Sequence, residues 1–260
     1  PAMSDTPRLH RRGLLLGAAA VTGGAVLGTL PLTPRAARAA TGGHAPRVHT
    51  RADWAARPPK APATVLAKAP DHIVVHHTAS ENSTDYSLEH AFGLSRAIQN
   101  FHMDDNGWDD TGQQLTISRG GFLMEGRNRS LEAIAARQHV MGAQTLGHND
   151  HTIGIENEGT YLTETPTKHL WLKLAVTCAW LCETYDLDPF EAIVGHRDYV
   201  ATACPGDRLY EMLPALRIMV AGIMELTTSP DRELHTPRRG PFPAPRTRFD
   251  HGPAAAPGER

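Results

Sequence analysis

The sequence has little of several features that mark common protein classes. Only 3 of its 260 residues are cysteine, too few for the disulfide framework of a small secreted domain. The formal net charge of -2 gives no general electrostatic reason to expect binding to nucleic acid or to an anionic membrane. Aromatic residues make up 6%, which argues against a long surface for stacking sugar rings. The His-Glu-x-x-His motif of many zinc peptidases is also missing.

Apolar residues make up 40% of the chain, enough to bury a core, and their spacing predicts both strands and helices. Strand patterns occupy residues 73–77, 115–118, 122–125 and 152–157, of which the second and third form a hairpin around a glycine turn. Helical spacing occupies residues 87–103, with Ser87 as N-cap, 168–185, and 208–225, which Pro214 interrupts. Interleaved strands and helices predict an α/β fold with a single mixed central β-sheet flanked by helices.

The first 39 residues have the organisation of an export signal. Arg11-Arg12 precede an uncharged run over residues 13–30, and residues 37–39 (Ala-Arg-Ala) give an A-x-A cleavage site. The paired arginines predict a twin-arginine signal and therefore a protein that is secreted or held in the cell wall. No stable membrane insertion is expected after cleavage. A membrane anchor is the alternative, because a run of this length approaches the ~20 residues that span a bilayer.

The remaining chain divides by composition. Residues 40–60 form a lead-in segment, and residues 61–226 hold the strand and helix patterns of the main domain. From 227 to 260 the chain is rich in proline, arginine and glycine with few aliphatic residues, so we expect a disordered tail. Contact between its arginines and acidic wall polymer is the alternative.

Two of the three cysteines lie four residues apart in a predicted helix. Cys178 and Cys182 would share one face of the helix over residues 168–185. Disulfide geometry is awkward across a single helical turn. We therefore predict two buried thiols that pack as small apolar groups.

Potential metal ligands follow two of the apolar runs. His76 ends a predicted strand, and His196 and Cys204 lie eight residues apart in a polar loop closed by Cys-Pro-Gly. Neutral imidazole and thiolate are both good zinc ligands. Three protein ligands leave the fourth position to water, the open arrangement of a catalytic zinc. The neighbouring His77 points to the other side of its strand, where packing is expected.

These motifs resemble the zinc N-acetylmuramoyl-L-alanine amidases, a family that includes the phage T7-type amidase and the peptidoglycan recognition proteins. The similar segments, in the family's order, are Val-Val-His76-His77-Thr-Ala, Gly126-Arg127, and residues 153–156, 195–198 and 202–206. The similarity runs from about residue 50 to about residue 216. It implies one zinc ion with His76, His196 and Cys204 as ligands.

The resemblance also implies two catalytic residues. Glu156 matches the glutamate with which bacterial amidases of this superfamily activate the zinc water. It lies among apolar strand residues, where a carboxylate is destabilising unless it has a task or a partner. The alternative role for Glu156 is a buried ion pair with an arginine such as Arg127. Thr202 stands two positions before the cysteine ligand, where it would bond an oxyanion or carbonyl, or alternatively shape the loop.

Two further residues are candidates for substrate binding. Gln113 stands where phage and animal relatives carry a tyrosine that points at the zinc water. Glutamine can donate a hydrogen bond to an oxyanion but cannot act as a phenolic acid, so acid–base work would fall on Glu156. The planar fork of Arg127 suits a substrate carboxylate, with a structural ion pair as the alternative.

The sequence therefore predicts a secreted, monomeric zinc hydrolase. It would cleave the amide bond between N-acetylmuramic acid and L-alanine in peptidoglycan and muropeptides. A non-catalytic peptidoglycan recognition module is the alternative. Such relatives typically lose the cysteine ligand, which this chain keeps as Cys204, whereas Gln113 leaves the alternative open. A zinc peptidase acting within the stem peptide is a third, weaker interpretation.

Overall fold

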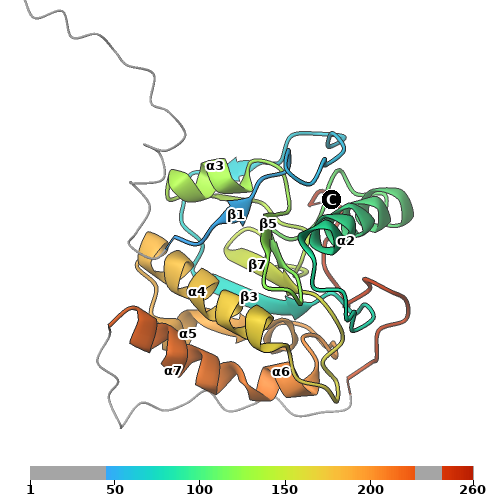
Figure 1. Ribbon diagram of the computed structural model, residues 1–260. Helices are drawn as coiled ribbons and strands as arrows, with labels where there is room; N and C mark the ends of the chain where they lie inside the picture. Colours follow the sequence, from blue (N-terminus) through green and yellow to red (C-terminus); the bar gives the residue numbers. More distant parts are fainter. Residues whose placement is uncertain (1–44, 226–241, 260) are drawn as a thin grey trace, which may run out of the picture.

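The computed structural model describes residues 45–225 and 242–259. Its centre is a mixed six-stranded sheet in the order β1-β5-β4-β7-β3-β8 (Figure 1). The strands are β1 Val48–His49, β3 His72–His77, β4 Leu115–Ile117, β5 Leu123–Glu125, β7 Thr152–Asn157 and β8 Ile193–Gly195. A small second sheet pairs β2 Val65–Leu66 with β6 His139–Val140. The predicted signal at residues 1–39 lies outside the described residues.

Strand register brings the candidate site residues to one edge of the sheet. Strand β3 runs parallel to both β7 and β8, and His76 is paired with Glu156. Strand β4 runs parallel to β7, with Thr116 opposite Glu156, and forms the predicted hairpin with β5. The carboxyl ends of parallel strands meet at the same edge, where α/β proteins commonly place their ligands.

The three predicted helical stretches are helical. The helices are α2 Leu88–Asn100, which continues into the π-helical turn η2 Phe101–Asp105, α3 Ser130–Ala135, α4 Lys168–Tyr185, α5 Pro189–Ala192, the 3-10 turn η3 His196–Asp198, α6 Asp207–Glu211 and α7 Leu213–Ile223. The short helices α3 and α5 were not predicted. Helix α4 has the predicted bounds, and Ser87 caps α2 by accepting a hydrogen bond from the backbone of His90. The break between α6 and α7 lies beside Pro214, as expected. None of the described helices is both long enough and apolar enough to span a bilayer.

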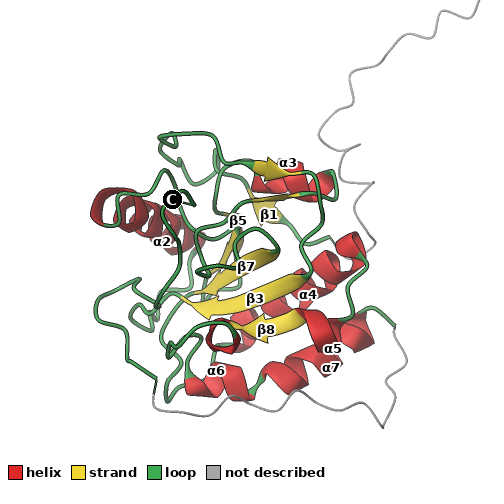
Figure 2. Ribbon diagram, turned by 180° about the vertical axis from the view of Figure 1, so that it is seen from behind, coloured by secondary structure: helices red, strands yellow, loops and turns green. Residues whose placement is uncertain are grey.

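The sheet has one apolar and one polar face. Side chains alternate along each strand, so Ile73, Val75, Ile153 and Ile155 share a face. They pack in the main core with residues of α4, including the free thiols of Cys178 and Cys182, which are buried as predicted (Figure 1). His76, Glu156 and Thr116 alternate to the opposite face. Figure 2, which is turned by 180° from Figure 1, shows this face, with loops rather than long helices lying over β3 and β7.

Residues 242–259, here called the C-terminal segment, return to this polar face (Figure 1, red). Phe249, His251 and Ala254 are buried against the domain. The expectation of a disordered tail is therefore wrong for these residues. Only a few apolar side chains and several hydrogen bonds hold the segment, and composition alone does not reveal such anchors. Residues 226–241 and 260 lie outside the described residues.

Candidate metal centre

Four potential metal ligands meet at the carboxyl edge of the sheet. His76, His196, Cys204 and His251 present ligand atoms that all lie within 4.8 Å of one another. The first three side chains are fully buried and His251 is 3% exposed. Three of the four are the ligands expected from the sequence. The fourth comes from the C-terminal segment and was not predicted.

Backbone geometry fixes the three expected residues. His76 lies in β3, and His196 directly follows β8, the strand beside it. Cys204 is held by the loop around Arg197, whose guanidinium contacts the carboxylate of Asp207 at 2.7 Å and donates to the carbonyl of Cys204 at 3.3 Å. The thiol sulfur also accepts from the backbone N–H of His77 at 3.4 Å.

Hydrogen bonds on the outer nitrogens fix how the three histidines face the cluster. The Nε2 atom of His76 lies 2.6 Å from Gln144 Oε1, that of His196 lies 3.0 Å from the carbonyl of Pro253, and that of His251 lies 2.9 Å from Glu156 Oε1. All three partners are acceptors, so each Nε2 carries the proton and donates it. Each Nδ1 then has a free lone pair that faces the cluster, the tautomer that a metal-binding histidine requires.

The inner distances suit a tetrahedral zinc site. His76 Nδ1 lies 3.7 Å from Cys204 Sγ, and His251 Nδ1 lies 3.4 Å from His196 Nδ1. Tetrahedral zinc with ordinary bond lengths separates two nitrogens by about 3.4 Å and a nitrogen from a sulfur by about 3.6 Å. Two imidazole lone pairs this close repel one another unless a cation lies between them. The donor set therefore fits zinc.

Burial sets the protonation of these groups. Burial, followed by the nearby histidines, holds the pKa of His76 and of His196 well below the usual value, so both imidazoles are neutral. Burial raises the pKa of the Cys204 thiol, and the backbone N–H of His77 lowers it only in part. A buried thiol that ionises therefore needs a cation beside it, which a divalent metal provides.

Glu156 contacts the cluster through His251. Its side chain is 1% exposed, and its second oxygen, Oε2, has no hydrogen-bond partner among the described residues. The alternative of an ion pair with Arg127 is wrong for the described structure. Arg127 instead donates to the carbonyl of Thr111 at 3.0 Å and to that of Glu259 at 3.2 Å. Among the described residues, the carboxylate thus lies beside the cluster with the ring of His251 as its partner and without a lysine or arginine.

The structure separates the other two candidates. Thr202 donates to the carbonyl of His251 at 2.6 Å and accepts from the N–H of Cys204 at 3.1 Å, so it lies next to the cluster. Gln113 is buried and donates to Thr116 Oγ1 at 2.9 Å, one strand from Glu156, rather than to any atom of the cluster.

Sequence reasoning missed three residues here. His251 supplies the fourth potential ligand atom, and Gln144 hydrogen-bonds the outer nitrogen of His76. His102 lies close to Glu156 and His251, where its Nε2 is buried without a partner in the described structure. A signal existed for His251 alone: it lies in the stretch Arg-Phe-Asp-His-Gly, the one part of the tail that combines an aromatic residue with a metal-ligand side chain.

Comparison with known proteins identifies the class. Residues 66–207, more than half of the chain, match the family described as N-acetylmuramoyl-L-alanine amidase, and the chain belongs to this family. The N-acetylmuramoyl-L-alanine amidase of Homo sapiens is 32% identical over 171 residues, which cover 65% of this chain and 28% of that protein. Peptidoglycan-recognition protein LB of Drosophila melanogaster is 30% identical over 164 residues, covering 63% of this chain and 66% of that one. The chain thus spans less than a third of the human relative's length.

Solved structures agree on the fold. Wild-type Drosophila PGRP-LB has a TM-score of 0.56 at 27% identity and covers 72% of this chain and 99% of that one. Peptidoglycan recognition protein LE, solved in complex with tracheal cytotoxin, has a TM-score of 0.57 at 27% identity and covers 65% and 92%. The predicted α/β fold with a mixed central sheet is confirmed.

Proposed function

We propose that this chain is a zinc-dependent amidase that hydrolyses the bond between N-acetylmuramic acid and L-alanine in peptidoglycan. The observation that carries the proposal is the buried group of two imidazoles and one thiol, His76, His196 and Cys204, beside the carboxylate of Glu156. Family membership supports the reaction. The tracheal cytotoxin in complex with a relative of similar fold, described as monomeric diaminopimelic acid-type peptidoglycan, supports the substrate class.

The chain's own residues have distinct tasks in this reaction. The chemistry that bound zinc supplies is Lewis-acid chemistry, which lowers the pKa of water toward ~7 and polarises the amide carbonyl. Glu156 takes a proton from the attacking water and passes it to the departing amine of L-alanine. Thr202, two residues from Cys204, donates a hydrogen bond to the oxyanion. Because Gln113 contacts Thr116 rather than the cluster, it stays a proposed contact to substrate without an acid–base role.

We also propose an organisation of the chain that suits this reaction. We propose an export signal of the twin-arginine type at residues 1–39, a lead-in at 40–60 and an amidase domain over 61–226. Secretion or retention in the wall would place a monomer beside its polymeric substrate. Arg127 would bind a carboxylate of the stem peptide.

The direct test measures metal and products in one sample. The zinc-loaded chain is incubated in molar excess over a defined muropeptide, so that a slow enzyme still completes one turnover. Mass spectrometry then looks for a stem peptide with a free L-alanine amino terminus, with Cys204→Ala as the control. Stem peptide from the parent chain alone supports the amidase. Tight muropeptide binding with no cleavage, in the presence of bound zinc, would instead identify a recognition protein that has kept its metal.

A further inference from the structure

The C-terminal segment lies across the site that would need to be open for catalysis. Its backbone binds the domain on both sides of the metal cluster. The carbonyl of Pro253 accepts from His196 Nε2 at 3.0 Å, and that of Ala254 accepts from Asn149 at 2.8 Å. The carbonyl of His251 accepts from Thr202 at 2.6 Å. These contacts fix His251 over the cluster from a chain position 55 residues beyond His196.

His251 adds a fourth potential ligand atom to the cluster, where a catalytic zinc would keep one position for water. Its Nδ1 lies 3.4 Å from His196 Nδ1, and its proton-bearing Nε2 lies 2.9 Å from Glu156 Oε1. A carboxylate that accepts a hydrogen bond from the outer nitrogen of a histidine is a common support for a metal ligand. With four protein ligands a zinc site is closed, as in structural sites, whereas catalytic sites keep one position open.

The segment also engages side chains that the proposed reaction needs. Thr202, the proposed oxyanion donor, is bonded to the carbonyl of His251. Arg127, the proposed partner of a substrate carboxylate, donates to the carbonyl of Glu259 at 3.2 Å. Glu156, the proposed base, is bonded to the ring of His251. One stretch of chain therefore contacts all three residues to which the proposed reaction assigns a role.

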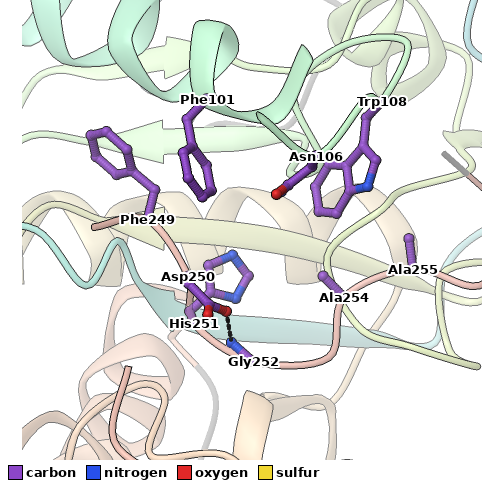
Figure 3. Close-up of a pocket in the computed structure, with 9 residues that line it drawn as sticks. All are labelled: Phe101, Asn106, Trp108, Phe249, Asp250, His251, Gly252, Ala254 and Ala255. Carbon is purple, nitrogen blue, oxygen red and sulfur yellow. Dashed lines mark hydrogen bonds between the residues drawn. The ribbon is translucent and has the colours of Figure 1, made fainter. Parts of the chain in front are cut away.

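The aromatic side chain of Phe249 is one of the anchors of this stretch. Phe249 packs with Leu94 and Ile98 of α2 and lies 5.9 Å, ring to ring, from Phe101. Its backbone has φ of 64°, a left-handed conformation that a bulky residue adopts only when packing holds it. Figure 3 shows Phe249 and Phe101 at one end of the pocket, with His251 lying below it.

Two pockets border the segment. The pocket between the end of α2, Trp108 and the segment has a volume of about 260 Å³, and the pocket between Thr202 and the segment has a volume of about 380 Å³. Sites that bury a drug-sized ligand usually measure ~300–1,000 Å³, so both pockets lie near or below the lower end of that range. A disaccharide with a stem peptide is larger than such a ligand, so neither pocket has room to enclose it while the segment is docked.

We infer that the C-terminal segment is an autoinhibitory latch in which His251 is the fourth metal ligand and the backbone around it excludes peptidoglycan. This inference rests on the proposed function. Displacement of the segment would open one coordination position and release Thr202, Arg127 and Glu156 together. The latched chain therefore binds metal but turns over slowly, because only the open fraction accepts substrate.

The first test reads the coordination position without any reaction. The full chain and His251→Ala are loaded with Co²⁺, whose visible absorption reports the number and type of its ligands, and thiocyanate is then titrated in. The latch predicts that the spectrum of the full chain stays unchanged, whereas that of His251→Ala shifts as thiocyanate binds at the open position. An equal shift in both proteins would overturn the inference.

The second test measures access to substrate. Muropeptide binding and single-turnover cleavage are compared for the full chain, His251→Ala and Phe249→Ala, with His169→Ala as the matched control at an exposed position on α4. A segment docked ~90–99% of the time reduces apparent affinity and rate by about 10–100-fold. We therefore expect His251→Ala to bind and cleave about 10–100-fold better than the full chain, Phe249→Ala to gain less, and His169→Ala to match the full chain.

The outcomes separate this inference from the proposed function. If every variant cleaves at the rate of the full chain, the amidase stands and the latch is wrong. If no variant cleaves but His251→Ala binds muropeptide more tightly and its cobalt spectrum responds to thiocyanate, the latch stands and the amidase is wrong. Loss of metal and of cleavage in His251→Ala would make the segment an essential part of the site, which also overturns the latch.

Discussion

Among the described residues, a buried and a surface cluster of histidines differ in the properties that a metal site needs. On the surface, Asp71, His72 and His151 bring possible ligand atoms within 4.8 Å, as the buried cluster does. There, however, Asp71 Oδ1 lies 2.6 Å from His72 Nδ1 and 2.7 Å from His151 Nδ1. The carboxylate therefore accepts a hydrogen bond from each ring, and neither Nδ1 has a free lone pair left for a metal.

In the buried cluster the acceptors lie outside and the lone pairs point inward. Gln144, Pro253 and Glu156 each accept from an outer Nε2, and the inner Nδ1 atoms face one another. Residue type and proximity are therefore insufficient to identify a metal site. The positions of the protons, which the surrounding acceptors fix, decide which cluster needs a cation.

The largest expected effect is the loss of metal from the buried cluster, with no change caused by a substitution in the surface cluster. Cys204→Ala should reduce bound zinc well below the one per chain of the parent, because the buried site loses its anionic ligand and keeps only the neutral imidazoles of His76, His196 and His251. Asp71→Ala, which opens the surface cluster, should leave zinc unchanged. So should Cys178→Ala, the same substitution at a buried thiol of α4. Zinc per chain after dialysis is the measurement, and zinc loss in Asp71→Ala would reverse the comparison.

The next effect separates catalysis from metal binding. Glu156→Gln keeps the size of the side chain and its acceptor oxygen but loses the base, so zinc should remain while turnover falls by ~10²–10⁴-fold. Glu158→Gln is the matched control, since this buried carboxylate contacts His90 and the backbone of Arg119 rather than the cluster. Single-turnover cleavage, with zinc measured in the same samples, tests both variants. Parent rates in Glu156→Gln would mean that the base lies elsewhere.

A smaller effect is expected when an acceptor that bonds the outer nitrogen of a cluster histidine is removed. Gln144→Met keeps the length of the side chain but removes the oxygen that accepts from His76 Nε2, so zinc affinity should fall by ~10–100-fold. Gln114→Met is the matched control. Gln114 is a second buried glutamine, and it bonds Val140 and Gly154 rather than a potential metal ligand. Competition with a chelator measures both affinities. An equal loss in the two variants would show a general packing effect instead.

The smallest effect concerns acid stability of the metal-free chain. Burial lowers the pKa of His77 to about 3 and holds that of His102 well below its usual value, against ~6.5 in the unfolded chain. The unfolded state then binds more protons below pH ~6.5, so stability present above that pH is lost as pH falls toward the folded values. Each such histidine contributes a slope of ~1.4 kcal/mol per pH unit.

Urea unfolding in chelator at pH 7.5 and 5.5 measures this slope. His102→Gln should unfold with a shallower pH dependence than the parent chain, because one titrating group is removed. An unchanged dependence would mean that His102 is not held neutral by burial.

Much of the fold, and three of the four potential metal ligands, could be predicted from local sequence pattern. The apolar spacing within each segment predicts strands β3 and β7 and helix α4, and α4 has its predicted bounds. His76 and His196 each end or follow an apolar run, so parallel strands bring them to one edge of the sheet, and Cys204 follows His196 in the adjoining loop.

The rest depends on contacts that no local pattern carries. His251 reaches His196 across 55 residues through a segment whose composition indicates disorder, and Phe249 packs this segment against α2. Gln144 supports His76 across 68 residues. The absence of an ion pair between Glu156 and Arg127 likewise follows from backbone carbonyls that happen to lie near the guanidinium.

The most direct test of the central claim is the position of bound zinc in a crystal of the loaded chain, read from anomalous scattering at the zinc absorption edge. The account predicts one strong peak between the Nδ1 atoms of His76 and His196 and the sulfur of Cys204. A peak at Asp71 and His151 instead, or no peak in a protein that still cleaves muropeptide, would contradict it.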